Sequence, residues 1–179
     1  MKLKLITTGI ALCFCVLFSN VKAQDLMISA GVDLVMPLGD FGDFASFGAG
    51  IAVGAEYGIS DNIGLTVQTG YDLLFVDSEI DFIKSMSIIP AQAGLKYYFD
   101  EVGSGVYAHG QVGIHSMSIT AEDVAGGETE SDSNLSFAIG GGIFVNENLD
   151  LGLRFNIITS GEDGVDASNY IGVRAGYNF

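Results

Sequence analysis

Apolar residues alternate with small or polar residues along eight segments of the chain. In the first segment every second position from Leu26 to Met36 is apolar, while Ser29, Gly31 and Asp33 stand between them. A period of two places the two sets of side chains on opposite faces of a β-strand. The segments cover residues 26–36, 49–57, 63–73, 89–99, 106–115, 135–145, 149–157 and 170–179. They are longer than the usual strand of five or six residues and close to the 9–11 residues of a tilted membrane-spanning strand.

Short and long connections follow one another between these segments. The short connections are 60–62, 100–104 and 146–148, and the long ones are about 37–47, 75–86, 119–134 and 159–168. An even number of strands, with short turns at one end and long loops at the other, is typical of outer-membrane barrels. We therefore expect an all-β fold: an eight-stranded antiparallel up-and-down β-barrel in which each strand pairs with its neighbour and the eighth closes on the first.

The N-terminus has the pattern of an export signal. Lys2 and Lys4 precede an apolar run over residues 5–18, and the segment ends in Val21-Lys22-Ala23. The run is about 14 residues long, shorter than the roughly 20 residues that a membrane-spanning helix needs. We expect a signal peptide over residues 1–23, cleaved between Ala23 and Gln24, that directs the chain into the Sec pathway.

Cleavage would leave one barrel domain, residues 24–179, without cysteine, because Cys13 and Cys15 both lie in the signal. Disulfides, thiol catalysis and cysteine metal sites are then excluded. The chain has 7 Lys plus Arg against 22 Asp plus Glu, and three of the basic residues lie in the signal, so the mature charge is about −18. Such a charge excludes nucleic acid as a partner. With 49% hydrophobic and 16% charged residues, the chain is expected to fold.

Alternation alone is also compatible with a soluble periplasmic barrel that binds a ligand inside, as lipocalins do. Three features favour a barrel whose apolar face points outward and contacts lipid. The polar face is mostly Gly, Ala, Ser and Gln, and no charge occurs on the apolar face, where an arginine at mid-bilayer would cost roughly 2–4 kcal/mol. Aromatic residues gather near the ends of the apolar face, as they do at membrane interfaces. They are Tyr57, Tyr71, Tyr97, Phe99, Tyr177 and Phe179.

The chain resembles the small outer-membrane β-barrel family, which includes the PorT-like barrels and, more distantly, OmpX and the OmpA membrane domain. The resemblance rests on the export signal, the eight segments and the C-terminal residues 170–179. The terminal alternation is similar to the family's assembly signal, at Ile171, Val173, Ala175, Tyr177 and Phe179. The resemblance implies the outer membrane of a Gram-negative bacterium, contact with lipid and lipopolysaccharide, and assembly by the barrel-assembly machinery. The resemblance is specific for the architecture and says little about the function, since such barrels serve as adhesins, secretion accessories, enzymes and structural proteins. We expect a monomer with a structural or interaction role and no cofactor.

Seven charged residues fall on the polar face and are expected inside the barrel. An eight-stranded barrel has room only for side chains, so we expect no open pore. A buried charge without a partner costs several kcal/mol, so we expect these residues to form an internal salt-bridge network. They are Asp33, Glu56, Asp72, Lys96, Asp150, Arg154 and Arg174.

A lipid-modifying enzyme of the outer membrane is a third, less favoured interpretation. It would need a site containing histidine, but His109 and His115 lie about 20 Å apart along one strand at 3.3 Å per residue. Ser116 and Ser118 fall on the other face from His115. We therefore expect no catalytic residues and no metal bound by the histidines.

The long connections are acidic. A solvated surface explains this, and clustered carboxylates also suit divalent cations, which could bridge to lipopolysaccharide. The acidic residues are Asp40, Asp43, Asp77, Glu79, Asp81, Glu122, Asp123, Glu128, Glu130, Asp132, Glu162, Asp163 and Asp166. Phe41, Phe44, Phe47, Phe82 and Ile83 either pack onto the barrel mouth or form a contact patch.

Overall fold

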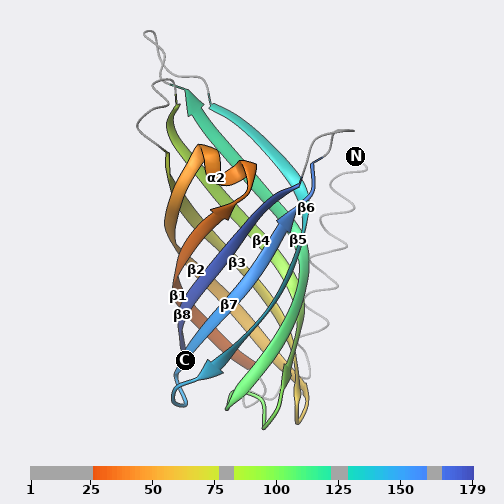
Figure 1. Ribbon diagram of the computed structural model, residues 1–179. Helices are drawn as coiled ribbons and strands as arrows, with labels where there is room; N and C mark the ends of the chain where they lie inside the picture. Colours follow the sequence, from red (N-terminus) through yellow and green to blue (C-terminus); the bar gives the residue numbers. More distant parts are fainter. Residues whose placement is uncertain (1–25, 77–82, 122–128, 161–166) are drawn as a thin grey trace, which may run out of the picture.

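The computed structural model describes residues 26–76, 83–121, 129–160 and 167–179, which form a closed antiparallel barrel (Figure 1). Each strand pairs with its neighbour along the chain and β8 closes on β1, which confirms the predicted topology. The strands are β1 (Leu26–Leu38), β2 (Ala45–Ser60), β3 (Ile63–Val76), β4 (Ile83–Tyr98), β5 (Val106–Ala121), β6 (Thr129–Phe144), β7 (Leu149–Ile158) and β8 (Ser168–Asn178).

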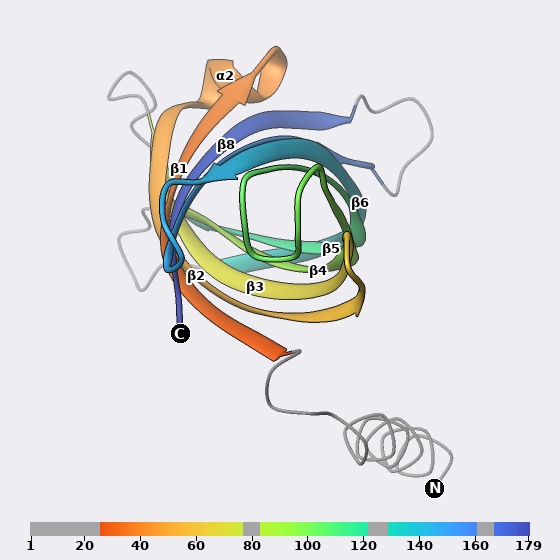
Figure 2. The same ribbon diagram turned by 90° about the horizontal axis from the view of Figure 1, so that it is seen from below.

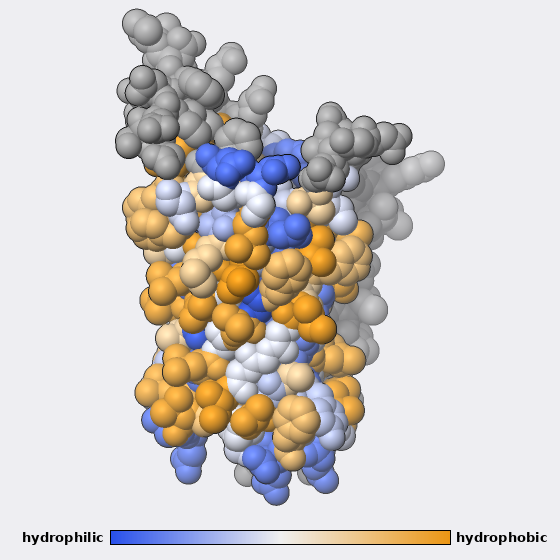
Figure 3. All heavy atoms as spheres, in the orientation of Figure 1, coloured by the Kyte–Doolittle hydropathy of each residue, from blue (hydrophilic) through white to orange (hydrophobic). Residues whose placement is uncertain are grey.

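Apolar side chains cover the outer wall. Ile51 and Ile139, for example, are 67% and 68% exposed. Figure 3 shows a belt of hydrophobic residues between hydrophilic residues at the two ends of the barrel. Such a belt is unfavourable in water and favourable in hydrocarbon, and a closed barrel leaves no unpaired strand edge within the membrane.

The strands at the long-loop end are longer than the hydropathy pattern predicts. β5 continues to Ala121 and β6 begins at Thr129, so most of the connection expected at 119–134 is strand. On the outer face of these extensions hydroxyl groups replace apolar side chains. Ser116 bonds Ser133 at 2.6 Å between the oxygens, and Ser118 bonds Ser131 at 2.8 Å. The alternation of apolar residues therefore stops before the backbone pairing does.

A short helix that the sequence did not predict, α2 (Asp40–Phe44), lies at the long-loop end (Figure 1). Its Phe41 is buried at the barrel mouth, whereas Phe47 faces outward and packs on Phe75 with ring centroids 4.7 Å apart. Phe41 therefore packs onto the barrel mouth, which is one of the two roles expected for the loop aromatic residues. Across the described ranges, no helix is long and apolar enough to span a membrane.

Two apolar clusters fill the lumen near its ends. The loop-end cluster consists of Val35, Phe41, Ala45, Leu74, Met86, Ile88, Ile158 and Tyr170. The turn-end cluster consists of Tyr98, Tyr107 and Phe144, with Val102 packed against them. Seen from below, the turn that carries Val102, between β4 and β5, lies inside the outline of the barrel (Figure 2). The amide of Val102 donates to the carbonyl of Asp61 at 2.9 Å, which ties this turn to the β2–β3 turn.

Candidate functional site

The polar lumen between the two apolar clusters is the candidate site. All seven charged residues predicted to face inward do so, from strands β1, β2, β3, β4, β7 and β8. Five of the seven charged side chains lean over a glycine of a neighbouring strand. For example, Arg154 Nε lies 3.0 Å from the place that a Cβ on Gly172 would occupy. The glycine-rich strands therefore provide space for long polar side chains.

The most buried ion pair joins Arg154 and Asp33. Arg154 Nη2 donates to Asp33 Oδ2 at 2.8 Å, and the two residues are 4% and 1% exposed. Strand register sets Asp33 opposite Arg174, but Arg154 reaches it from β7 across Gly172 of β8. The pair therefore links two strands that are not neighbours.

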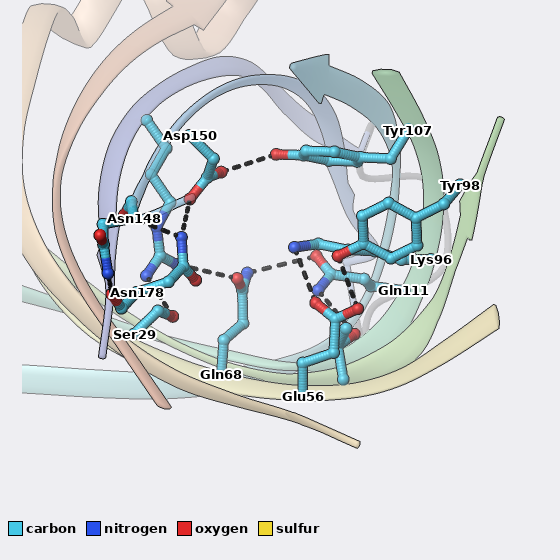
Figure 4. Close-up of polar contacts among 12 residues, drawn as sticks. Ser29, Glu56, Gln68, Lys96, Tyr98, Tyr107, Gln111, Asn148, Asp150 and Asn178 are labelled. Carbon is cyan, nitrogen blue, oxygen red and sulfur yellow. Dashed lines mark hydrogen bonds and ion pairs between the residues drawn. The ribbon is translucent and has the colours of Figure 1, made fainter. Parts of the chain in front are cut away.

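A second ion pair lies near the short-turn end. Lys96 Nζ is 2.9 Å from Glu56 Oε2, and Tyr98 donates its hydroxyl to Glu56 Oε1 at 2.7 Å. The ammonium also lies 4.4 Å from the ring centroid of Tyr107, within the range of a cation–π contact. Figure 4 shows Lys96 and Tyr98 converging on Glu56.

Asp150 and Arg174 are each held by neutral side chains. The hydroxyl of Tyr107 donates to Asp150 Oδ2 at 2.8 Å, and Asn178 Nδ2 donates to Oδ1 at 3.0 Å (Figure 4). Arg174 donates to Gln68 Oε1 at 3.1 Å and to Ser29 Oγ at 3.3 Å. Gln68 continues this chain of hydrogen bonds to Gln92 and Gln111. The side chains of five strands are thereby connected across the lumen.

Asp72 differs from the other charged residues. It is fully buried, and neither carboxylate oxygen has a hydrogen-bond partner. Asp33 Oδ1, Arg154 Nε and both amide atoms of Asn156 are also buried without a partner. The expected salt-bridge network is therefore met only by the two ion pairs: among the seven charged residues, Asp150 and Arg174 have neutral hydrogen-bond partners and Asp72 has none. Strand position alone put Asp72 among the inward charges but did not show that the three cations would be engaged elsewhere.

A small cavity lies in the half of the lumen nearer the short turns. Its volume is about 50 Å³, enough for a few water molecules. Its lining includes five of the charged residues, Glu56, Lys96, Asp150, Arg154 and Arg174. Both ring nitrogens of His109, which also lines the cavity, lack a protein partner. The cavity thus suits water that satisfies the remaining polar atoms.

The histidines do not form a catalytic site with the serines. His115 is fully buried and its Nε2 lies 2.7 Å from the hydroxyl of Tyr170, inside the barrel. Ser116 and Ser118 bond serines of β6 on the outer face. Within the described ranges, no group of three or more His, Cys, Asp or Glu residues is arranged to hold a metal ion.

The remaining predicted sites are covered only in part. Ala23, Gln24 and most of the acidic loop residues lie outside the described residues. Asp132 is described and accepts from the amide of Ser133 and from Asn134 Nδ2. The proposed assembly signal occupies the outward face of β8, and the amide of Phe179 donates to Ile28 O at 2.9 Å, at the seam where the barrel closes.

Sequence reasoning missed the aromatic and aliphatic residues of the lumen. Tyr98, Phe144, Val35 and Ile158 stand at positions where the alternation would place small or polar residues. Each lies at the end of its segment, where a break in the alternation is easily taken for the start of a loop. Apolar residues in the polar phase near a segment end were therefore the signal that could have revealed the two clusters.

Comparisons with known proteins agree with this geometry. Residues 10–179 match the model of the family described as outer membrane protein beta-barrel domain. The chain belongs to this family. A comparison with curated proteins by sequence gives no match.

Three solved structures illustrate the similarity in fold. The N-terminal barrel of Pseudomonas aeruginosa OprF is 14% identical with a TM-score of 0.62, covering 86% of this chain and 97% of that one. Ail of Yersinia pestis, solved with the heparin analogue sucrose octasulfate, is 17% identical with a TM-score of 0.65, covering 87% and 98%. Neisserial surface protein A is 16% identical with a TM-score of 0.56, covering 86% and 95%. The chain is an outer-membrane β-barrel of a Gram-negative bacterium.

Proposed function

We propose that this barrel is a non-catalytic, non-conducting structural protein that holds its long-loop end at the outer surface as a contact site. The observation that carries the proposal is that side chains fill the lumen, with an apolar cluster near each end and bonded polar groups between them. A filled lumen suits a rigid support better than a channel. The bonding of His115 to Tyr170, away from the outward serines, supports a role without catalysis.

Conductance tests the closed lumen. The purified barrel is inserted into planar lipid bilayers and compared with an open porin at equal protein density. We expect no stepwise current, because ions would have to pass both apolar clusters. Regular conductance steps in the wild-type protein would contradict the proposal.

A charged residue on the outer wall tests the contact with lipid. Ile139 is 68% exposed and faces outward in the middle of the apolar belt. Ile139→Arg should lower the free energy of unfolding in lipid vesicles by roughly 2–4 kcal/mol. Glu147→Arg, at the exposed turn between β6 and β7, is the control and should change it little. Equal effects would argue against hydrocarbon at Ile139.

Lipopolysaccharide is the partner that the outer face near the long loops suits. Directly beyond the apolar belt, three adjacent strands present hydroxyl groups, which match the sugars and phosphates of lipid head groups. These residues are Ser85, Ser87, Ser116, Ser118, Thr120, Ser131 and Ser133. Among side chains that the structure describes, every lysine and arginine faces the lumen. Contact with phosphate would therefore depend on hydroxyl groups, or on divalent cations that bridge acidic residues to the phosphate. This charge distribution does not suit a sulfated sugar such as the one bound to Ail.

The thermal midpoint of unfolding in vesicles tests this contact. We expect a higher midpoint in vesicles with lipopolysaccharide than in phospholipid alone, and a smaller gain after addition of EDTA. The double variant Ser118→Ala/Ser131→Ala should reduce the gain, because it removes one hydroxyl pair. Thr69→Ala, an outward hydroxyl within the apolar belt, is the control. A gain that neither EDTA nor the double variant changes would contradict the proposal.

Assembly by the barrel-assembly machinery and a monomeric state complete the proposal. The outward C-terminal alternation ending in Tyr177 and Phe179, whose ring centroids are 5.0 Å apart, supports recognition of the last strand. Pairing of β8 with β1 supports a monomer, since the closed barrel leaves no strand edge in the belt for a second copy.

A further inference from the structure

The charges in the described part of the lumen do not balance. Between the two apolar clusters lie four carboxylates and three cationic side chains. The carboxylates are those of Asp33, Glu56, Asp72 and Asp150, and the cations are Lys96, Arg154 and Arg174. If every group is ionised, the lumen carries one uncompensated negative charge in a low-dielectric surrounding, which is strongly unfavourable.

The contacts identify the carboxylate without a counter-charge. Arg154 pairs with Asp33 and Lys96 pairs with Glu56. The third cation, Arg174, lies beside Asp150, because both side chains approach the place that a Cβ on Gly176 would occupy. Arg174 Nε is 3.5 Å from that place and Asp150 Oδ1 is 2.5 Å from it. Asp72 is therefore the carboxylate that remains.

Asp72 is also the carboxylate with the fewest bonds. It is 0% exposed, and both of its oxygens lack a hydrogen-bond partner. The other three carboxylates each accept at least one hydrogen bond, from Arg154, from Tyr98, or from Tyr107 and Asn178. Charge and hydrogen bonding thus single out the same residue independently.

The side chain of Asp72 leans toward Asp33. In the strand register Gly50 of β2 stands between them, paired with Asp33 on one side and with Asp72 on the other. Asp72 Oδ1 occupies the space that a side chain on Gly50 would fill, so the carboxyl group extends across β2 in the direction of β1. There, Asp33 Oδ1 is buried and has no partner.

We propose that Asp72 is a proton-binding site of the folded barrel, in which its carboxyl group carries a proton and donates it in a hydrogen bond to Asp33 Oδ1. One proton removes the excess negative charge. It also turns an oxygen of Asp72 into a donor, which is what the unbonded Asp33 Oδ1 requires. A proton needs no additional space, whereas a bound metal ion would need a cavity and several oxygen ligands.

The groups that surround Asp72 leave this arrangement intact. Asp33 on β1 is the acceptor, and Arg154 on β7 is engaged with Asp33 Oδ2. On β8, Arg174 donates toward Gln68 and Ser29, and the Tyr170 hydroxyl lies 2.7 Å from His115 Nε2 of β5. From β2, β4 and β6 the neighbouring inward residues are uncharged: Gly50, Ala52, Ile88, Pro90, Ser136 and Ala138. No described cation is therefore left to compensate Asp72.

The proton makes the stability of the barrel depend on pH. The folded barrel holds a proton on Asp72 that the unfolded chain releases to water, so the folded state binds more protons. Raising the pH then lowers the stability of the folded state, and lowering the pH raises it. The Asp72→Asn variant should lack this contribution, since its amide donates to Asp33 Oδ1 without a titrating proton.

Two matched variants test the proposal in the full-length barrel in detergent. Asp72→Asn should keep the thermal midpoint of unfolding or raise it, and its midpoint should fall less than that of the wild type from mildly acidic to alkaline buffer. Asp150→Asn removes a carboxylate that accepts two hydrogen bonds and lies beside Arg174, so its midpoint should fall by several degrees. In the infrared spectrum of protein with ¹³C-labelled aspartate, a protonated-carboxyl C=O band should be present in the wild type and absent in Asp72→Asn.

Other results would overturn the proposal. These are the absence of a protonated-carboxyl band, its persistence in Asp72→Asn, or a loss of stability in Asp72→Asn as large as that in Asp150→Asn. Failure of Asp72→Asn to fold while Asp150→Asn folds would have the same meaning. A fall in wild-type stability on exchange of sodium and potassium for a bulky organic cation would show that a metal ion takes the place we assign to the proton.

Discussion

The two halves of the polar lumen differ in how fully their polar atoms are bonded. In the half nearer the short turns, Glu56 and Asp150 accept from tyrosine hydroxyls and lie beside a cation. In the half nearer the long loops, Asp72 and Asn156 are fully buried, and no oxygen or nitrogen of their side chains has a partner. Similar residue types thus occupy two different environments within one barrel.

The difference follows from the neighbours of each half. Tyr98 and Tyr107 of the turn-end cluster donate their hydroxyls to Glu56 and Asp150, and Tyr107 also lines the small cavity. The loop-end cluster contributes mainly aliphatic side chains, and its one tyrosine, Tyr170, is engaged with His115. Apart from His109, whose ring nitrogens lack a protein partner and which lines the cavity, the turn-side half therefore gains stability from hydrogen bonds. The loop-side half contains polar groups whose burial is unfavourable.

Arg154 connects the two halves, and its replacement should have the largest effect. Arg154→Met keeps most of the side-chain volume but leaves Asp33, 1% exposed, without its cation. We expect a loss of about 3–5 kcal/mol in the free energy of unfolding, measured by urea titration in lipid vesicles. The double variant Arg154→Met/Asp33→Asn should recover much of the loss. If Arg154→Met alone is as stable as the wild type, the pair does not hold the halves together.

Replacement of Lys96 tests the turn-side half alone. Lys96→Met keeps an apolar contact with the three aromatic rings but removes the ion pair with Glu56. Glu56 retains the hydroxyl of Tyr98, so we expect a smaller loss of about 2 kcal/mol in the same titration. Lys96→Arg should lose less stability than Lys96→Met. A loss as large as that of Arg154→Met would mean that Tyr98 does not support Glu56.

The sequence predicted the wall of the barrel better than its interior. A period of two determines which side chains face lipid, so eight strands, their order and the inward position of Asp33, Glu56 and Arg154 followed from the pattern. The partners inside depend on how far each side chain leans over a glycine. Arg154 reaches Asp33 across Gly172 although Arg174 stands opposite in the register, and no pattern along one strand contains that information.

Loss of one hydroxyl from the turn-side half should have a moderate effect. Tyr107→Phe keeps the ring beside Lys96 and removes the donor to Asp150 Oδ2. Asp150 keeps Asn178 as a donor, so we expect a loss of about 1 kcal/mol, measured as a shift of the urea midpoint at unchanged slope. Tyr97→Phe, whose ring is 52% exposed on the outer wall, is the control. Equal shifts in the two variants would indicate that the hydroxyl of Tyr107 adds nothing inside the lumen.

The smallest effect, and the one that separates the two halves most clearly, is expected at Asn156. Its side chain is fully buried on β7, two residues from Arg154, and neither amide atom has a protein partner. Replacing an unbonded buried amide by an apolar group of similar shape removes an unfavourable burial. Asn156→Leu should therefore leave the free energy of unfolding unchanged within about 1 kcal/mol or raise it, because the gain offsets the crowding from the larger side chain. Gln111→Leu, in the bonded chain of Gln68 and Thr66, should lower it. If Asn156→Leu were the more damaging of the two, buried water would have to bond Asn156, and the contrast between the halves would lie in hydration instead of in unmet hydrogen bonds.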